Sequence, residues 1–133
     1  MPYLRGYKTI QLVKRRKDLT HEQFKNYWLT EHNKKIERRL INIGLRRELT
    51  ASFAEGVVIK GEVAPGIEPP FDGMLEMFFE HDSVEDVKAS WTQELVDFLP
   101  ELFEDEKNFC DPEKRAIILI EEWVMAERKP KEK

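Results

Sequence analysis

Only one cysteine, Cys110, occurs in the 133 residues, so the chain cannot form an internal disulfide. No cationic segment followed by a long apolar run opens the chain, and its longest apolar run, 116–120, is far too short to cross a bilayer. An excess of positive charge is also missing, because 22 Lys and Arg residues stand against 26 Asp and Glu residues. These absences disfavour a membrane protein or a nucleic-acid-binding protein. They favour a cytoplasmic protein whose partner is a small molecule or another protein.

Signatures of metal and nucleotide sites are missing as well. His21, His32 and His81 do not have the spacing of a known metal site. The chain has no glycine-rich phosphate loop and no nucleophile elbow. We therefore expect neither a metal nor a nucleotide cofactor. Cys110 has no neighbouring base in the sequence, which indicates an inert thiol rather than a nucleophile.

The composition, with 41% hydrophobic and 36% charged residues, is that of a single compact domain covering residues 1–133. Alternating or β-branched segments predict four strands, at 7–14, 45–53, 73–80 and 115–125. Between the second and third strands, the Gly- and Pro-rich segment 55–72 predicts a long surface loop after a short strand extension at Val57–Ile59. The basic run 14–17 is expected to be a solvated loop.

The most clearly marked helix is predicted over residues 20–40, where Thr20 and Gln23 form a capping box at its start. Its apolar stripe contains Phe24, Tyr27, Trp28 and Ile36. His32 lies in the same stripe, where a purely structural helix would have Leu or Ile. This histidine is the odd residue of the chain.

A second helix is predicted to begin at Asp82 or Ser83 and to continue to about Phe98. Pro100 fits the first turn of a separate short helix, 101–107. Asp111-Pro112 predicts a turn before the last strand.

The order strand, helix, strand, strand, helix, strand predicts an α+β protein with a ferredoxin-like split β-α-β fold. In that fold a four-stranded antiparallel sheet carries two helices on one face. The last strand is apolar on both sides, with Ile117, Leu119 and Trp123 on one face and Ile118, Ile120 and Val124 on the other. The bare face of the sheet therefore requires a second layer, and face-to-face pairing in a homodimer supplies it.

Three motifs of the chain are the run from Lys14 to Phe24 with Tyr27-Trp28 and Glu31-His32, the segment Phe71-Asp72-Gly73-Met74-Leu75-Glu76, and Asn108-Phe109-Cys110-Asp111-Pro112 with the later Glu121-Glu122. Together they resemble the EthD-type proteins of the dimeric α+β barrel superfamily. The resemblance covers nearly the whole chain. The family commonly has Ala-Pro after its helix histidine, whereas Asn33-Lys34 follows His32 here, so we expect the helix to continue.

The resemblance implies a dimeric α+β barrel and a cofactor-free enzyme that acts on small, often aromatic or polyketide-derived compounds. Cyclases, dehydratases and lactone isomerases are the implied activities. Some dimeric barrels bind haem through one helical histidine, so haem is retained as an alternative. A Soret band after the addition of haem would reveal such a site.

His32 is the first catalytic candidate, because imidazole exchanges protons near neutral pH, as enolisation, aldol-type cyclisation and dehydration require. A hydrogen-bonded core histidine is the equal alternative. Glu76, which is flanked by large apolar residues, is the candidate carboxylate partner of His32, with a pair to a lysine or to Arg46 or Arg47 as the alternative. Asp72 is a weaker candidate, because Asp before Gly is usually a turn residue.

Gln11 and Tyr27 are candidate donors to a substrate oxygen, and Trp28, Phe78 and Trp91 are candidate aromatic walls of a binding site. Three hypotheses follow: a lyase or isomerase that uses His32, a non-catalytic protein that binds a hydrophobic metabolite, and a structural dimerisation module. A His32 that faces accessible space beside a carboxylate favours catalysis. A sealed His32 bonded to a backbone carbonyl favours a structural role.

Overall fold

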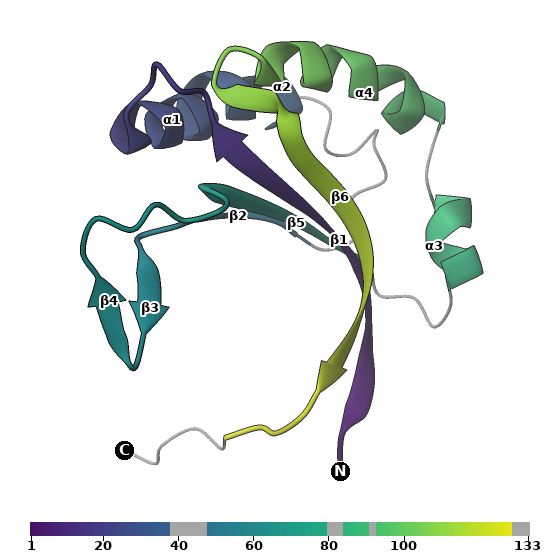
Figure 1. Cartoon of the computed structure of the whole chain (residues 1–133). Coiled ribbons are helices and arrows are strands. Elements are labelled where there is room, and N and C mark those ends of the chain that lie inside the picture. The colour runs from purple at the N-terminus through teal and green to yellow at the C-terminus, as the bar shows by residue number, and fades with distance from the viewer. Residues whose placement is uncertain (38–47, 80–83, 91–92, 129–133) are drawn as a thin grey trace, which may run out of the picture.

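The computed structural model of this chain describes residues 1–37, 48–79, 84–90 and 93–128 (Figure 1). Its main sheet has four antiparallel strands, β1 (Tyr3–Arg15), β2 (Leu49–Phe53), β5 (Gly73–Phe79) and β6 (Cys110–Val124), in the order β2-β5-β1-β6. This is the strand order of the ferredoxin-like fold, so the predicted α+β class and topology are confirmed.

The helices are α1 (His21–Tyr27), the π-helical turn η1 (Trp28–His32), α2 (Asn33–Glu37), α3 (Val84–Ser90) and α4 (Gln93–Glu106). Figure 1 shows α1, α2 and α4 on one face of the sheet, which curves so that its other face is concave. No described helix covers that concave face. In the part of the chain that the structure describes, no helix is long and apolar enough to cross a membrane.

The segment from α1 to α2 is one continuous helical unit, as predicted. Its capping box is present, since the Gln23 N–H donates to Thr20 Oγ1 at 3.1 Å and the Thr20 N–H donates to Gln23 Oε1 at 2.9 Å. Asn33 continues the helix, as expected from the absence of Ala-Pro after His32. Residues 38–40 of the predicted helix lie outside the described residues.

The π-helical turn explains why a stripe with steps of four residues is buried without drifting round the helix. On an α-helix, side chains four residues apart are offset in one direction around the helix axis. A π-helical turn contains more residues per turn and offsets them in the opposite direction. Here that turn is closed by the Asn33 N–H, which donates to the Trp28 carbonyl. Thr30 Oγ1 donates to the Asn26 carbonyl at 2.7 Å, a side-chain bond that weakens the regular ladder at this point. As a result Phe24, Trp28, His32 and Ile36 are all buried.

An aromatic cluster forms the core between α1 and the sheet. Phe24, Trp28 and Phe109 are buried and contact one another, with ring centroids 5.6 to 5.7 Å apart. Val13 of β1 lies beneath them. Trp28 also packs edge to face on Phe53, which ties β2 to the helix.

Two predicted breaks are wrong. Pro100 does not begin a separate helix but lies inside α4, which runs unbroken from Gln93 to Glu106. A proline in a helix interior removes one backbone hydrogen bond, so tertiary packing rather than local propensity holds this helix together. Asp111-Pro112 lies within β6, where pairing shifts from Val13–Arg115 to Arg15–Cys110, so the turn signal marks a bulge in the strand.

The predicted strand bounds differ from the structure at several ends. The first strand begins at Tyr3 rather than at residue 7, and its early residues pair with β6. β2 begins at Leu49, and residues 45–47 of the predicted strand lie outside the described residues. The predicted loop 55–72 contains a hairpin of β3 (Val57–Ile59) and β4 (Glu62–Ala64), joined by Lys60-Gly61, whose φ angles of 52° and 81° suit a two-residue hairpin turn.

Gly73 has a packing role that a turn signal does not explain. A Cβ built on this residue would overlap Cζ3 of Trp28 and would lie 3.2 Å from Cζ of Phe24. The Trp28 ring therefore lies directly on the backbone at the start of β5. Only glycine allows that approach without moving the core.

We predict that Gly73→Ala lowers the free energy of unfolding by about 1–3 kcal/mol, because the added methyl overpacks the aromatic cluster. Urea denaturation measures this loss. The double variant Gly73→Ala/Trp28→Phe is expected to lose less than the sum of the two single variants, since the smaller ring relieves the overlap. Strict additivity, or a Gly73→Ala variant as stable as the unmodified protein, would contradict this explanation.

Candidate functional site

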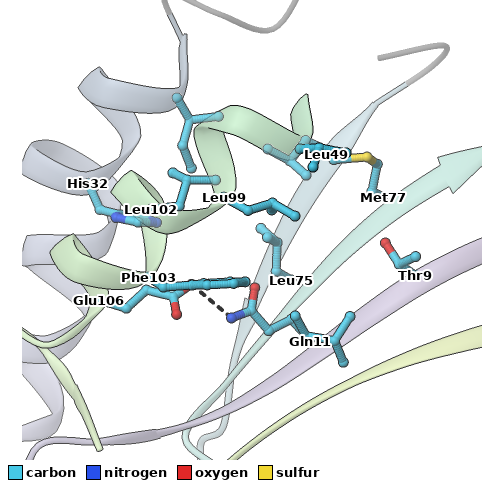
Figure 2. A pocket seen from close by; sticks show the side chains of 13 residues that line it. Thr9, Gln11, His32, Leu49, Leu75, Met77, Leu99, Leu102, Phe103 and Glu106 are labelled. Atoms are coloured by element: carbon cyan, nitrogen blue, oxygen red, sulfur yellow. Dashed lines mark hydrogen bonds between the residues drawn. The ribbon is translucent and has the colours of Figure 1, made fainter. Parts of the chain in front are cut away.

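A cavity of about 200 Å³ lies between the helices and the helix-bearing face of the sheet (Figure 2). Most of its wall is apolar and consists of Ile36, Leu49, Leu75, Met77, Val96, Leu99, Leu102, Phe103 and Ile117. The polar lining residues are Thr9, Gln11, His32 and Glu106. An apolar wall with a few polar groups is typical of a site for a small organic ligand.

His32 is 3% exposed and contributes its ring to this cavity wall. Its Nδ1 lies 2.7 Å from Oδ2 of Asp105, near the end of α4. The ring also packs on Phe109, with centroids 4.9 Å apart. The histidine of the first helix is thus bonded to a carboxylate and not to a backbone carbonyl.

Asp105 is 5% exposed and is surrounded by donors. Its Oδ1 accepts from the Tyr27 hydroxyl at 3.0 Å, from Asn108 Nδ2 at 3.2 Å and from Lys35 Nζ. Burial alone would raise the pKa of this carboxyl, but hydrogen bonds from Lys35, His32 and Tyr27 outweigh it and lower the pKa to about 2. Asp105 is therefore ionised throughout the neutral range.

The ionised carboxylate decides which imidazole nitrogen carries the proton. Asp105 can only accept hydrogen bonds, so Nδ1 of His32 is the donor. In the neutral ring Nε2 then holds the lone pair, and it makes no hydrogen bond within the described part of the chain. Such a nitrogen can take a proton from a ligand, and Asp105 stabilises the imidazolium that results.

Glu106 is a second buried carboxylate at the cavity, with 7% exposure. Gln11 Nε2 donates to its Oε1 at 2.8 Å, the bond drawn in Figure 2, and Arg115 Nη1 forms an ion pair with its Oε2. The Arg115 guanidinium lies 4.0 Å from the centroid of the Phe103 ring. Gln11 is thus a wall residue of the cavity, where it holds Glu106 in place.

The sequence does not single out Asp105 as the partner of His32, because Pro100 predicts a helix break that separates it from the apolar stripe before it. Without that break, the stripe of α4 continues from Phe98 and Leu102 to Asp105, as the stripe of the first helix continues to His32. A second signal is the run of three acidic residues, Glu104, Asp105 and Glu106, in the last turn of a helix, where the helix dipole disfavours them. Carboxylates in that position require cations from elsewhere in the fold.

The comparisons with known proteins agree with this architecture. A family model for the EthD domain matches residues 16–113, which is most of the chain. The chain belongs to the EthD family. Among curated proteins, no significant match to this EthD-family chain is found.

Solved structures similar to this EthD-family chain share its fold at low identity. A dimeric protein of unknown function with a ferredoxin-like fold, from Bacteroides fragilis, is 22% identical with a TM-score of 0.51, covering 90% of this chain and 99% of its own. An EthD-family protein from Bacillus halodurans is 19% identical with a TM-score of 0.55 and the same coverage of both chains. An EthD-like protein from Ralstonia eutropha is 19% identical with a TM-score of 0.54, covering 93% of this chain and 96% of its own.

The predicted pairing of Glu76 with His32 is wrong. Leu75 and Met77 of β5 line the cavity, so Glu76 between them projects from the opposite, concave face of the sheet. There Lys8 Nζ lies 2.8 Å from Glu76 and 2.8 Å from Glu122. The alternative of a lysine pair is the one that occurs in this EthD-family chain.

Phe78 also lies on the concave face, close to Lys8 and Glu76, and is no wall of the His32 cavity. Trp28 is buried in the aromatic core and does not line the cavity either. Tyr27 donates to Asp105, so it acts on the histidine pair rather than on the cavity. Trp91 lies outside the described residues.

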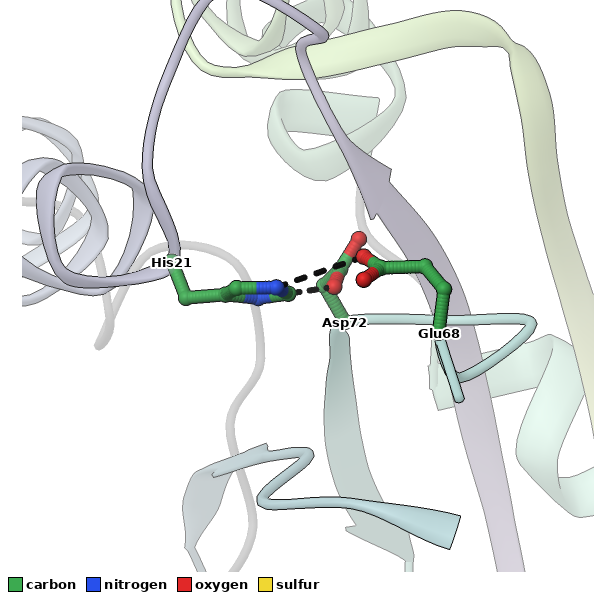
Figure 3. A group of neighbouring side chains, drawn as sticks. All are labelled: His21, Glu68 and Asp72. Atoms are coloured by element: carbon green, nitrogen blue, oxygen red, sulfur yellow. Dashed lines mark ion pairs between the residues drawn. The ribbon is translucent and has the colours of Figure 1, made fainter. Parts of the chain in front are cut away.

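Asp72, the other expected partner of His32, lies in a separate cluster with His21 and Glu68 (Figure 3). His21 Nδ1 is 3.1 Å from Asp72 Oδ1, and His21 Nε2 is 3.3 Å from Glu68 Oε1. Asp72 is 2% exposed and accepts from the Arg15 N–H at 2.8 Å. The predicted Asp72–His32 pair is therefore wrong as well.

The ligand atoms of His21, Glu68 and Asp72 lie within 4.8 Å of one another, close enough to share a metal ion. Lys14 Nζ, however, is 3.2 Å from Glu68 and 3.3 Å from Asp72. Arg15 adds a contact of 3.2 Å to Glu68. Because these cations already neutralise the carboxylates, the cluster is a network of ion pairs that joins the loop before β5 to the start of α1.

Lys14 and Arg15 therefore belong to β1 and to this ion-pair network, and not to the predicted solvated loop.

Cys110 is buried, and burial raises the pKa of its thiol far above the ordinary range. The thiolate is therefore absent at neutral pH. This agrees with the prediction of an inert cysteine.

We predict that Asp105→Asn lowers the free energy of unfolding at neutral pH by about 2 kcal/mol. The pKa of Asp105 falls on folding, so its contribution is complete above its ordinary pKa of 3.8 and is lost as the pH falls through about 2. As the pH falls from 3.8 to about 2, the free energy of unfolding of Asp105→Asn should therefore decrease less than that of the unmodified protein. Urea denaturation at a series of pH values measures both effects.

Glu104→Gln is the matched control, because Glu104 lies one residue earlier on α4 and is exposed. Its stability should remain within about 0.5 kcal/mol of the unmodified protein. An Asp105→Asn variant with the acid dependence of the unmodified protein would show that Asp105 is not the buried ionised group described above.

Proposed function

We propose that this EthD-family protein is a cofactor-independent enzyme that transfers a proton on a small apolar substrate, with His32 as the acid/base and Asp105 as its partner. The observation that carries this proposal is the 2.7 Å bond from His32 Nδ1 to the ionised Asp105 at the wall of an apolar cavity. A charged partner costs free energy in a buried site unless several donors hold it, and four side chains hold this one.

The proposed chemistry begins when Nε2 of His32 removes a proton from a carbon next to a carbonyl, or from the hydroxyl group of an enol. The electron pair left behind is delocalised over carbon and oxygen in either case, so both routes form an enolate. His32 then returns the same proton to another atom, which gives an isomerase, or to a departing hydroxyl, which gives a dehydratase. A cyclase follows the same course when the enolate carbon attacks a second carbonyl and His32 protonates the new alkoxide. Tyr27 and Lys35 keep Asp105 ionised and oriented throughout.

The competing function is that of a binding protein that holds a hydrophobic metabolite without converting it. The apolar majority of the cavity wall favours this role as much as it favours catalysis. Only the His32–Asp105 pair separates the two functions, because a simple binding site does not need a buried ionised carboxylate behind a histidine. Loss of turnover without loss of binding in a His32 variant is the result that distinguishes them.

We predict that His32→Ala lowers kcat by about 10²–10⁴-fold, the usual contribution of a general acid/base. The substrate is first found by thermal-shift screening of aromatic ketones, lactones and polyketide-like acids, because a ligand of the native state raises apparent stability. Turnover of the stabilising compound is then compared between variants at equal folded fraction.

His21→Ala is the control, since His21 lies on the same helical unit but in the separate cluster with Glu68 and Asp72. It should retain turnover. A folded His32→Ala variant with full turnover would exclude the proposed mechanism.

We also propose that two chains pair through the concave sheet face as a dimeric α+β barrel. The similar protein from Bacteroides fragilis is itself described as dimeric. Apolar residues Ile10, Leu12, Ile118 and Ile120 project from this face, on the opposite side to the cavity residues Gln11 and Ile117. An apolar sheet face without a second layer favours association.

We predict that the unmodified protein sediments as a dimer and that Ile118→Lys shifts it to the monomer, because the substitution buries a charge in the interface. Ile118 is 44% exposed in the single chain. Leu29→Lys is the matched control, since Leu29 is 50% exposed on the helical side and should not affect association. Sedimentation equilibrium that finds a monomer for the unmodified protein would refute the proposed pairing.

A further inference from the structure

The polar groups that line the cavity offer more hydrogen-bond acceptors than donors, because only the Thr9 hydroxyl and the second amide hydrogen of Gln11 are free to donate among the described lining residues. Gln11 donates one amide hydrogen to Glu106, and its Oε1 accepts no hydrogen bond from the described residues. Each Glu106 oxygen accepts one bond, from Gln11 or from Arg115, and keeps capacity for another. With Nε2 of His32, the described wall presents several acceptors to a ligand.

The charge of the wall has one sign. Among the described lining residues, Glu106 is the only acidic or basic side chain other than His32. Arg115, the counter-ion of Glu106, does not line the cavity, and its Nη1 pairs with the Glu106 carboxylate. An anionic ligand would therefore lie beside a buried carboxylate without a cation of its own in the described wall.

The cavity volume limits the size of the ligand. An apolar protein cavity of about 150 Å³ holds benzene. The cavity here is about 200 Å³, which suits one substituted ring better than a fused polycyclic compound.

We infer that the cavity selects a neutral single-ring compound that donates a hydroxyl hydrogen to Glu106, such as a phenol or a cyclic enol, and rejects the corresponding carboxylate. This inference rests on the proposed function, because it names the substrate class of the same cavity. It places Glu106 as the residue that determines specificity and His32 as the residue that moves the proton. Gln11 and Arg115 hold the Glu106 carboxylate in the orientation that receives the donor.

The experiment compares 4-ethylphenol, ethylbenzene and 4-ethylbenzoate, which share one apolar body and differ only in the polar group. At pH 7 the phenol is neutral and the benzoate is ionised. Affinities come from NMR titration of the isotope-labelled protein. We expect 4-ethylphenol to bind about ten- to a hundred-fold more tightly than 4-ethylbenzoate, as a hydrogen bond to a charged group predicts, with ethylbenzene between them.

Glu106→Gln tests the role of the carboxylate. The substitution removes the negative charge and leaves Arg115 without its counter-ion, so 4-ethylbenzoate should now bind at least as tightly as 4-ethylphenol. Gln11→Met keeps the Glu106 charge and should still reject 4-ethylbenzoate, which provides a second variant if Glu106→Gln does not fold. The exposed Glu104→Gln should leave all three affinities unchanged.

Equal binding of the phenol and the benzoate by the unmodified protein, or binding of none of the three probes, overturns the inference. So does a folded Glu106→Gln variant that keeps the original preference. His32→Ala separates this inference from the proposed function: it should retain the preference for 4-ethylphenol while turnover is lost. If His32→Ala retains turnover, the catalytic proposal alone is refuted. If Glu106→Gln loses the preference for 4-ethylphenol and turnover depends on His32, both the specificity inference and the catalytic proposal are supported.

Discussion

The hydrogen bond from His32 to Asp105 joins residues that are 73 positions apart, and the arrangement of the helical layer depends on it. It connects the π-helical turn of the first helical unit to the end of α4. Tyr27 and Lys35, which lie on either side of His32 in the sequence, bond to the same carboxylate, so three side chains of this unit contact Asp105. Because the carboxylate is buried and ionised, removing one partner leaves the others with an uncompensated charge. The first helical unit and the end of α4 are thereby held together, and the cavity lies between these helices and the sheet.

The two faces of the sheet have different chemistry because strand residues alternate. On the helix-bearing face, Gln11 and its neighbours meet apolar helix residues and leave a small cavity. On the concave face, Lys8 bridges Glu76 and Glu122 beside Phe78. A one-residue shift of register would exchange these faces and destroy both arrangements. Polar groups placed centrally on each face therefore specify the register of the strands.

The order of the elements could be predicted because alternation in the strands and the stripe that begins at Phe24 are local patterns. The position of His32 on a buried face was predictable for the same reason. Its partner was not, because Pro100 is a strong local signal for a helix break and only tertiary packing overrides it in α4. Glu76 failed as the partner because its flanking residues indicate burial but not which face of the sheet it occupies. Gly73 carries a turn signal in the sequence, yet the contact that requires glycine comes from Trp28 on a distant helix.

Asp105 holds the proton of His32 on Nδ1, so Nε2 of the neutral ring carries the lone pair. The most direct measurement is the nitrogen-15 NMR spectrum of the imidazole rings in the labelled protein, recorded at a pH at which His32 is neutral. We expect the proton of His32 on Nδ1 and an unprotonated Nε2, and we expect Asp105→Asn to abolish this preference. A His32 ring with its proton on Nε2 in the unmodified protein would show that Asp105 does not set the tautomer.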